Sequence, residues 1–227
     1  MDDFKYEIDE ARVFITGYTG AGGDVIVPST LGRLPVTNIG YRAFYNIRGL
    51  TRITLPNSLT IIGHRAFSGC SGLTRITLGN NIIDIGGGAF SGCCGLTSIT
   101  LPKSIATIGY RAFSGCTGLT KIALPNSITT IGHGAFKNCT GLTKITMPNS
   151  ITTVAYHAFL RCTSLTSITL PNRLTTIGHR AFAGCTGLTS ITLPNSITRI
   201  GNDAFSGCIS LTCRTLDAIA MLRRPAL

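Results

Sequence analysis

The stretch Leu119–Gly141, L-T-K-I-A-L-P-N-S-I-T-T-I-G-H-G-A-F-K-N-C-T-G, shows the unit from which most of this chain is built. Eight phenylalanines lie 23 residues apart along the chain, each preceded by alanine: Phe44, Phe67, Phe90, Phe113, Phe136, Phe159, Phe182 and Phe205. A Leu-Thr pair recurs at the same interval from Leu50 to Leu211. A fixed period of this length indicates a repeat architecture, so we expect stacked copies of one unit.

Each unit carries the pattern of two short strands followed by a turn. In Leu50–Leu55, apolar and polar side chains alternate as they do in a strand, and Pro56 then ends the hydrogen-bond ladder because it has no N–H. Residues 59–62 form a second extended piece, and residues 65–70 have room for one helical or 3-10 turn. One unit cannot bury its apolar side chains alone, so neighbouring units must stack and pair their strands.

The consensus L-T-x-I-T-L-P-N-S-I-T-T-I-G-x-x-A-F-x-G-C-T-G resembles the BspA-like class of leucine-rich repeats, over about residues 11–212. The opening segments Ile15–Gly20 and Val25–Pro28 also resemble the first unit of that family. The fold we predict is a leucine-rich-repeat solenoid of the β-rich α/β kind. It has a single curved parallel sheet of short strands and one-turn helical or 3-10 segments in each 23-residue repeat. The resemblance implies a recognition or adhesion protein that is secreted or exposed on the cell surface.

The ends of the chain differ from its middle. Residues 1–40 break the period, because Val25–Pro28 matches Ile53–Pro56 only after an insertion of five residues. We therefore predict an N-terminal cap or first atypical repeat over 1–40, an array of 23-residue repeats over 41–212, and a degenerate C-terminal cap or tail over 213–227.

Composition and charge limit the possible partners. The chain of 227 residues has 44% hydrophobic and only 13% charged residues, which argues against intrinsic disorder. Its formal net charge is +11, and no nucleic-acid motif accompanies that charge, so we expect no specific nucleic acid partner. No stretch reaches the ~18 apolar residues of a membrane span. The acidic start M-D-D-F-K-Y-E-I-D-E is no secretory signal, which leaves a cytoplasmic location as the alternative.

Because the units repeat, the outward strand positions form two columns of exposed side chains, one basic with serines and one rich in threonine. We predict that these columns bind a partner, with the following residues: Arg52, Thr54, Arg75, Thr77, Thr100, Lys121, Lys144, Thr146, Thr169 and Thr192. The expected partner is a protein with an acidic surface. The alternative is a polyanionic glycan held by net positive charge. A third reading stays open, in which threonine merely favours strands and the cations keep the face soluble.

The cysteines, histidines and acidic residues are too dispersed along the chain to form a catalytic site or a metal site. Seven of the nine cysteines share one column, with no C-x-x-C pair, and we expect buried free thiols. The histidines of the His64 column never occupy adjacent units, so no metal site is expected. Between Val25 and Asn202 the only acid is Asp84, which leaves no carboxylate pair for acid–base chemistry. We therefore predict that the protein is not an enzyme and that it has no catalytic residues and no cofactor.

Overall fold

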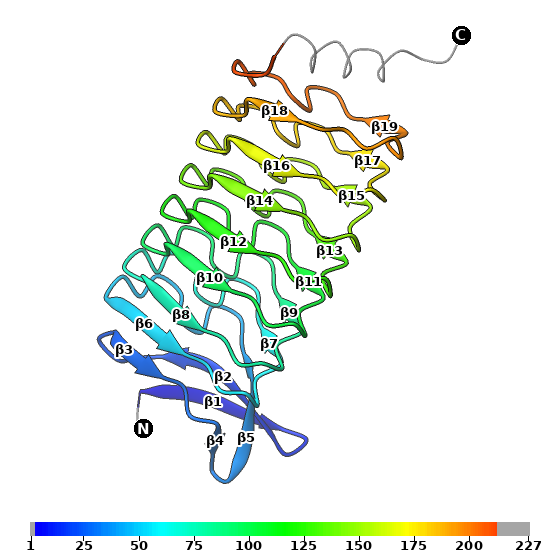
Figure 1. Ribbon diagram of the computed structural model, residues 1–227. Coiled ribbons are helices and arrows are strands. Elements are labelled where there is room, and N and C mark those ends of the chain that lie inside the picture. The colour runs from blue at the N-terminus through cyan, green and yellow to red at the C-terminus, as the bar shows by residue number, and fades with distance from the viewer. Residues whose placement is uncertain (1–2, 213–227) are drawn as a thin grey trace.

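The computed structural model describes residues 3–212 as a solenoid whose coils stack along one axis (Figure 1). The predicted leucine-rich-repeat solenoid is thereby confirmed. We number the regular coils as rungs 1 to 7, with these residue ranges: 50–72, 73–95, 96–118, 119–141, 142–164, 165–187 and 188–210. The prediction for 213–227 lies outside the described residues, and the division into cap, array and tail stays a prediction.

The first strand of each rung contributes to what we call the main ladder, in which neighbouring strands run parallel. Its strands are β3 (Gly23–Ile26), β6 (Leu50–Thr54), β8 (Arg75–Thr77), β10 (Ser98–Thr100), β12 (Lys121–Ala123), β14 (Lys144–Thr146), β16 (Ser167–Thr169) and β18 (Ser190–Ile191). The pairing is in register at the repeat interval, so that side chains of equivalent positions line up across the face.

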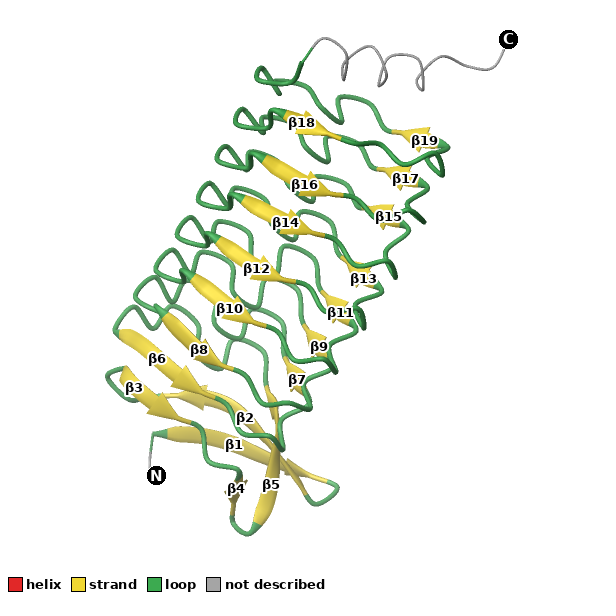
Figure 2. Ribbon diagram, viewed as in Figure 1, coloured by secondary structure: helices red, strands yellow, loops and turns green. Residues whose placement is uncertain are grey.

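The second extended piece of each rung forms a parallel second ladder, beginning at β5 (Leu34–Ile39). Its other strands are β7 (Ile61–Ile62), β9 (Asp84–Ile85), β11 (Thr107–Ile108), β13 (Thr130–Ile131), β15 (Thr153–Val154), β17 (Thr176–Ile177) and β19 (Arg199–Ile200). The two rows of strands are separate in Figure 2. The expected single sheet is thus divided, in the described residues, into several hydrogen-bonded sheets along two sides of the coil.

The N-terminal residues close one end of the stack with longer strands. β1 (Phe4–Asp9) pairs antiparallel with β2 (Arg12–Tyr18), and β2 pairs parallel with β5 of the second ladder. β4 (Thr30–Leu31) pairs antiparallel with β5. Phe4 and Tyr18 pack over Phe44, with Tyr18 and Phe44 stacked at 5.1 Å between ring centroids, so this end continues the core of the array.

The third side of each rung is a turn, where the expected helical or 3-10 segments are absent from the described residues (Figure 2). In rung 1 the N–H groups of Arg65, Phe67 and Gly69 donate to carbonyls of rung 2. The intervening N–H groups of Ala66 and Ser68 instead donate three residues back within their own rung. Every second N–H therefore pairs with the neighbouring coil, which prevents a helix because a helix directs all its N–H groups along its own axis.

The core contains columns in which the same side chain recurs in successive rungs. The eight repeat phenylalanines form a continuous stack, with centroid separations of 5.0–5.5 Å between successive rings. Beside them lies the cysteine column, in which each thiol donates to a phenylalanine carbonyl 26 residues earlier; Cys70, for example, bonds to the Phe44 oxygen at 2.9 Å. No helix within residues 3–212 is long and apolar enough to cross a bilayer.

Candidate functional site: the main sheet face

All ten predicted binding residues are exposed on the outer face of the main ladder. Nine of them lie within its strands, and Thr192 follows directly after β18. The register aligns Arg52 with Arg75 and Lys121 with Lys144. The structure therefore places these residues on one side of the coil, while their role in binding stays a prediction.

Arg52 differs from the other cations of this face because an acid neutralises it. Its guanidinium lies 3.5 Å from the Asp24 carboxylate, to which the Thr51 hydroxyl also donates at 2.9 Å. Asp24 belongs to β3, the first strand of the ladder, and pairs in register with Arg52. The sequence analysis missed this pair, although the alignment of Val25–Pro28 with Ile53–Pro56 already places Asp24 opposite Arg52.

The remaining cations of the face have no carboxylate partner within the described residues. Arg75, Lys121 and Lys144 are exposed, and both ion pairs of residues 3–212 involve other side chains. Lys121 and Lys144 stand side by side on neighbouring strands. Because like charges at directly opposed strand positions repel each other, this arrangement lowers stability slightly and leaves positive charge available to a partner.

The threonines of the main face fall into two classes within the described residues. Those at the start of the main strands, with the exception of Thr97, use their hydroxyls internally, as when Thr74 donates to the Thr51 carbonyl at 3.0 Å or Thr120 to the Thr97 carbonyl at 3.2 Å. The predicted binding threonines make no side-chain hydrogen bond within residues 3–212; they are Thr54, Thr77, Thr100, Thr146, Thr169 and Thr192. Their hydroxyls therefore keep both donor and acceptor capacity for another molecule.

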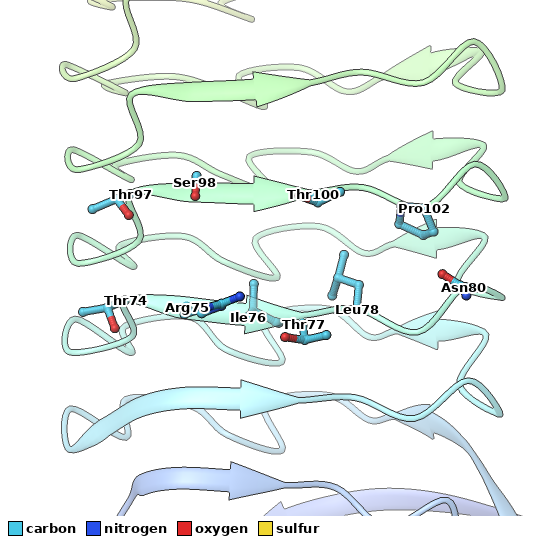
Figure 3. A pocket seen from close by; sticks show the side chains of 10 residues that line it. All are labelled: Thr74, Arg75, Ile76, Thr77, Leu78, Asn80, Thr97, Ser98, Thr100 and Pro102. Carbon is cyan, nitrogen blue, oxygen red and sulfur yellow. The ribbon is translucent and has the colours of Figure 1, made fainter.

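A hollow of about 520 Å³ interrupts the face between rungs 2 and 3 (Figure 3). Arg75 and Thr77 of β8 line it from one rung, and Ser98 and Thr100 of β10 from the other. Leu78, Asn80 and Pro102 surround it at the loop end. The hollow thus combines a guanidinium, several hydroxyls and an apolar rim.

A break in the main ladder underlies this hollow. The N–H of Thr74 donates to Thr51 and that of Thr120 to Thr97, but the equivalent bond from Thr97 to Thr74 is absent, and β8 does not pair with β10. The hydrogen bond from the Thr97 hydroxyl to the Thr74 carbonyl is missing as well, although the equivalent hydroxyl bonds of Thr74 and Thr120 are present.

Rung 2 has a different loop sequence, which explains the break. It reads Gly79-Asn80-Asn81 where most rungs have Pro-Asn-Ser. A Cβ on Gly79 would lie 2.1 Å from the Pro56 carbonyl oxygen, so only glycine permits this approach to rung 1. The Asn80 N–H donates to the Asn57 side chain at 2.9 Å and fixes the approach. The loop stays bonded to rung 3, because the Ser104 hydroxyl donates to the Asn80 carbonyl at 2.8 Å, so the gap lies between strands β8 and β10 rather than between the loops.

The cysteine column is buried, and its thiols have low reactivity. Burial raises the pKa of Cys70 to about 11 and that of Cys139 to about 12, which keeps these thiols protonated at neutral pH. The expectation of buried free thiols is confirmed for the seven column members, whereas Cys94 is exposed and Cys213 lies outside the described residues. Within residues 3–212 no group of His, Cys, Asp and Glu is arranged to hold a metal ion.

Comparisons with known proteins agree with this architecture. The model of the BspA type leucine-rich repeat region matches in six copies, over residues 37–166 and 156–220. A crystallised leucine-rich repeat protein of T. pallidum is 30% identical with a TM-score of 0.81, and the match covers 98% of this chain and 94% of that protein. No curated protein matches.

A leucine-rich cell surface protein of Faecalibacterium prausnitzii A2-165 is 35% identical with a TM-score of 0.68. The match covers 92% of this chain but only 52% of that protein, so this chain corresponds to about half of it. Proteins built from these repeats are generally non-enzymatic modules for protein interaction or adhesion. From its repeats and its structural relatives, this chain belongs to the BspA-type leucine-rich repeat family.

Proposed function

We propose that this protein is a non-enzymatic recognition module that binds an acidic protein surface through the main sheet face. Arg75, Lys121 and Lys144 supply the charge, and the threonine column supplies hydrogen bonds. The setting we propose is adhesion at a cell surface or after secretion, as in the F. prausnitzii relative that is described as a cell surface protein.

The observation that carries this proposal is the pairing of like charges on an exposed face. Lys121 and Lys144 oppose each other in register, and neither has a carboxylate partner among the described residues. A face selected only for solubility would gain from interspersed charges of both signs. The retained cations are best explained by a partner that supplies the missing acids.

The hollow between β8 and β10 is the natural anchor point of such a partner. A carboxylate entering it would meet the Arg75 guanidinium and the hydroxyls of Thr77 and Thr100. Charge-assisted hydrogen bonds of this kind are about twice as strong as neutral ones. We therefore assign Arg75 a larger share of the binding than either lysine.

The test is charge reversal on the face, measured against a panel of acidic extracellular proteins. The triple variant Arg75→Glu, Lys121→Glu, Lys144→Glu should lose nearly all binding, because three attractive contacts become repulsive. The control variant Lys103→Glu, Arg161→Glu, Arg173→Glu changes the net charge equally at exposed positions off this face and should bind as the wild type does. Equal losses in both variants would contradict a specific role of the face.

A polyanionic glycan is the second candidate partner, favoured by the formal net charge of +11. The spacing of the cations argues against it, because Ser98, Ser167 and Ser190 interrupt the basic column. Retention on heparin distinguishes the two partners. A binder driven by charge alone elutes at moderate salt and responds equally to both triple variants, since screening acts on every exposed cation.

A further inference from the structure

A second groove, of about 650 Å³, is lined by residues of β15, β17 and β19 of the second ladder. These strands form a row separate from the main ladder (Figure 1). Its walls include His133, Tyr156 and Arg199. We propose that this groove is a separate docking site for an extended acidic peptide segment of a partner protein. In this arrangement an apolar side chain of the peptide lies on the groove floor and a carboxylate pairs with Arg199.

The groove begins where the second ladder is broken. The N–H of Gly132 donates to Ile108 and that of Gly178 to Val154, but the equivalent bond from Ala155 to Ile131 is absent. Consistently, β13 and β15 do not pair, although both strands lie within the described residues. Rungs 4 and 5 are therefore separated only locally, between β13 and β15, since the Gly134 N–H still donates to the Tyr156 carbonyl at 2.9 Å.

Ala155 explains this separation. The other regular rungs have glycine at its position, as in the Ile-Gly pair of Ile131 and Gly132. A Cβ on Gly132 would lie 2.6 Å from the backbone of Gly109 and Tyr110, a contact that forces a displacement. The methyl group of Ala155 must therefore hold rung 5 away from rung 4, which opens the end of the groove.

The floor of the groove is apolar and its walls carry hydrogen-bond donors. Ala155 and Ile177 are buried and Ile200 is half-buried, whereas Tyr156 is 47% exposed. Glycine at 178 deepens the floor, because a Cβ there would lie 2.7 Å from the Tyr156 ring. A floor of this kind suits an aliphatic side chain, and the walls suit an acceptor-rich backbone.

The charge of the groove requires an acidic occupant. Arg199 is exposed, and no carboxylate is among the residues that line the groove. The acid nearest in sequence, Asp203, pairs with Arg180 at 3.3 Å. Within the strands of the second ladder from β5 to β19, the one acid is Asp84, which belongs to rung 2, five rungs from Arg199. In the proposed complex, a carboxylate of the partner is the counterion of Arg199.

The packing of Tyr156 favours a peptide over a sugar. Its ring centroid lies 5.0 Å from that of His133, and on another side the ring contacts the backbone position of Gly178. With neighbours on these two sides, the tyrosine has less free ring face on which a sugar could stack. The groove extends over three rung spacings of ~4.8 Å, which about four extended residues span.

Selection from a random linear heptapeptide library displayed on phage, with the full chain as the target, tests the site. We expect enriched peptides that combine Asp or Glu with an aliphatic residue. Arg199→Glu should weaken their binding by about tenfold or more, because a charge-assisted bond becomes a repulsion. Ala155→Gly should weaken it as well, because the groove narrows when rungs 4 and 5 close.

Two controls separate this site from the main sheet face. Arg173→Glu, the same charge change off the groove, and the triple variant of Arg75, Lys121 and Lys144 should both bind the selected peptides as the wild type does. Failure to enrich acidic peptides overturns the proposal. So does enrichment of peptides that bind Arg199→Glu as well as the wild type, or that lose binding only in the triple variant. Neither result affects the proposed function of the main face.

Discussion

At the residue scale, the repeat determines the position of each side chain in two ways. Its place in the unit sets whether it is buried or exposed, and its copies in neighbouring rungs set which side chains lie beside it. The phenylalanine and cysteine columns could be predicted from spacing alone, because a period of 23 residues stacks equal positions. The hydrogen bond from each thiol to a phenylalanine carbonyl could not be predicted, because it depends on how neighbouring rungs are placed relative to each other. Asp24 is different, because the sequence alignment already places it opposite Arg52, and the pairing of β3 with β6 shows the contact.

Native thiol reactivity should divide the cysteines sharply. The seven column thiols are buried, and burial raises the pKa of Cys139 to about 12, so almost no Cys139 thiolate is present at neutral pH. Cys94 is exposed and should react rapidly with iodoacetamide, while Cys93 beside it stays unmodified until the chain unfolds. Mass spectrometric mapping of the labelled sites is the measurement, and rapid native labelling of the column would contradict the described packing.

Asp84 should make stability depend on pH. Partial burial raises the pKa of its carboxyl above the ordinary value of about 3.9. Since the folded state favours the protonated acid, the associated stability is present at low pH and is lost as the pH rises through the raised pKa. Asp84→Asn should therefore increase the melting temperature at pH 7 and have little effect at pH 3. An equal shift at both pH values would show that the carboxylate charge is not the cause.

At the element scale, strands were predictable and turns were not. Alternating side chains and the proline position predict the main strands, and the second extended piece also appears where it was expected. For the turn segment, the sequence of a single rung predicts one helical or 3-10 turn. In the solenoid, every second N–H of Arg65–Cys70 pairs with the next rung, an interaction that local sequence patterns do not reveal.

The two ladder breaks also show what the sequence could and could not indicate. Both coincide with visible departures from the repeat, Gly79-Asn80-Asn81 in rung 2 and Ala155 in rung 5. Their consequences depend on how closely neighbouring backbones approach, a distance that no pattern of residue types provides. The hollows, and with them the details of the candidate sites, therefore required the structure.

Hydrogen exchange tests the break at Ala155. The amide of Ala155 has no partner in rung 4, whereas that of Gly178 donates to Val154 at 2.8 Å. We expect the Ala155 amide to exchange much faster than the Gly178 amide in the wild type. Ala155→Gly should restore the bond to Ile131 and slow exchange at that position. Gly132→Ala should have the opposite effect one rung earlier, and unchanged exchange in both variants would disprove the steric explanation.

The hollow of the main face has an analogous test. Replacing Gly79 by Pro and Asn81 by Ser restores the common loop sequence, and a pyrrolidine ring cannot approach the Pro56 carbonyl as Gly79 does. Strand β8 should then move towards rung 3 and the Thr97 N–H should gain a bond to the Thr74 carbonyl. Slower exchange at Thr97 and weaker binding of an acidic partner are the expected results. A hollow that persists in a crystal structure of this variant would refute the assigned cause.

At the scale of the whole molecule, the coil separates structure from recognition. The stacked phenylalanines and cysteines hold the rungs together, and because the core has no polar side chain, the exposed columns are free to differ from rung to rung. On this scaffold the main face carries cations without counterions, and the groove over β15, β17 and β19 carries Arg199. The columns of the sequence predict the first surface, whereas the second opens at one end beside the methyl group of Ala155.

Lysine acetylation footprinting tests the central claim most directly, because the chain contains its own control. In complex with the acidic protein that binds best in the panel, Lys121 and Lys144 should be protected from acetylation. Lys103 and Lys137, which lie off the main strands, should react as in the free protein. Protection of the first pair alone is the result we predict. Protection of the second pair, with Lys121 and Lys144 still reactive, would contradict recognition through the main sheet face.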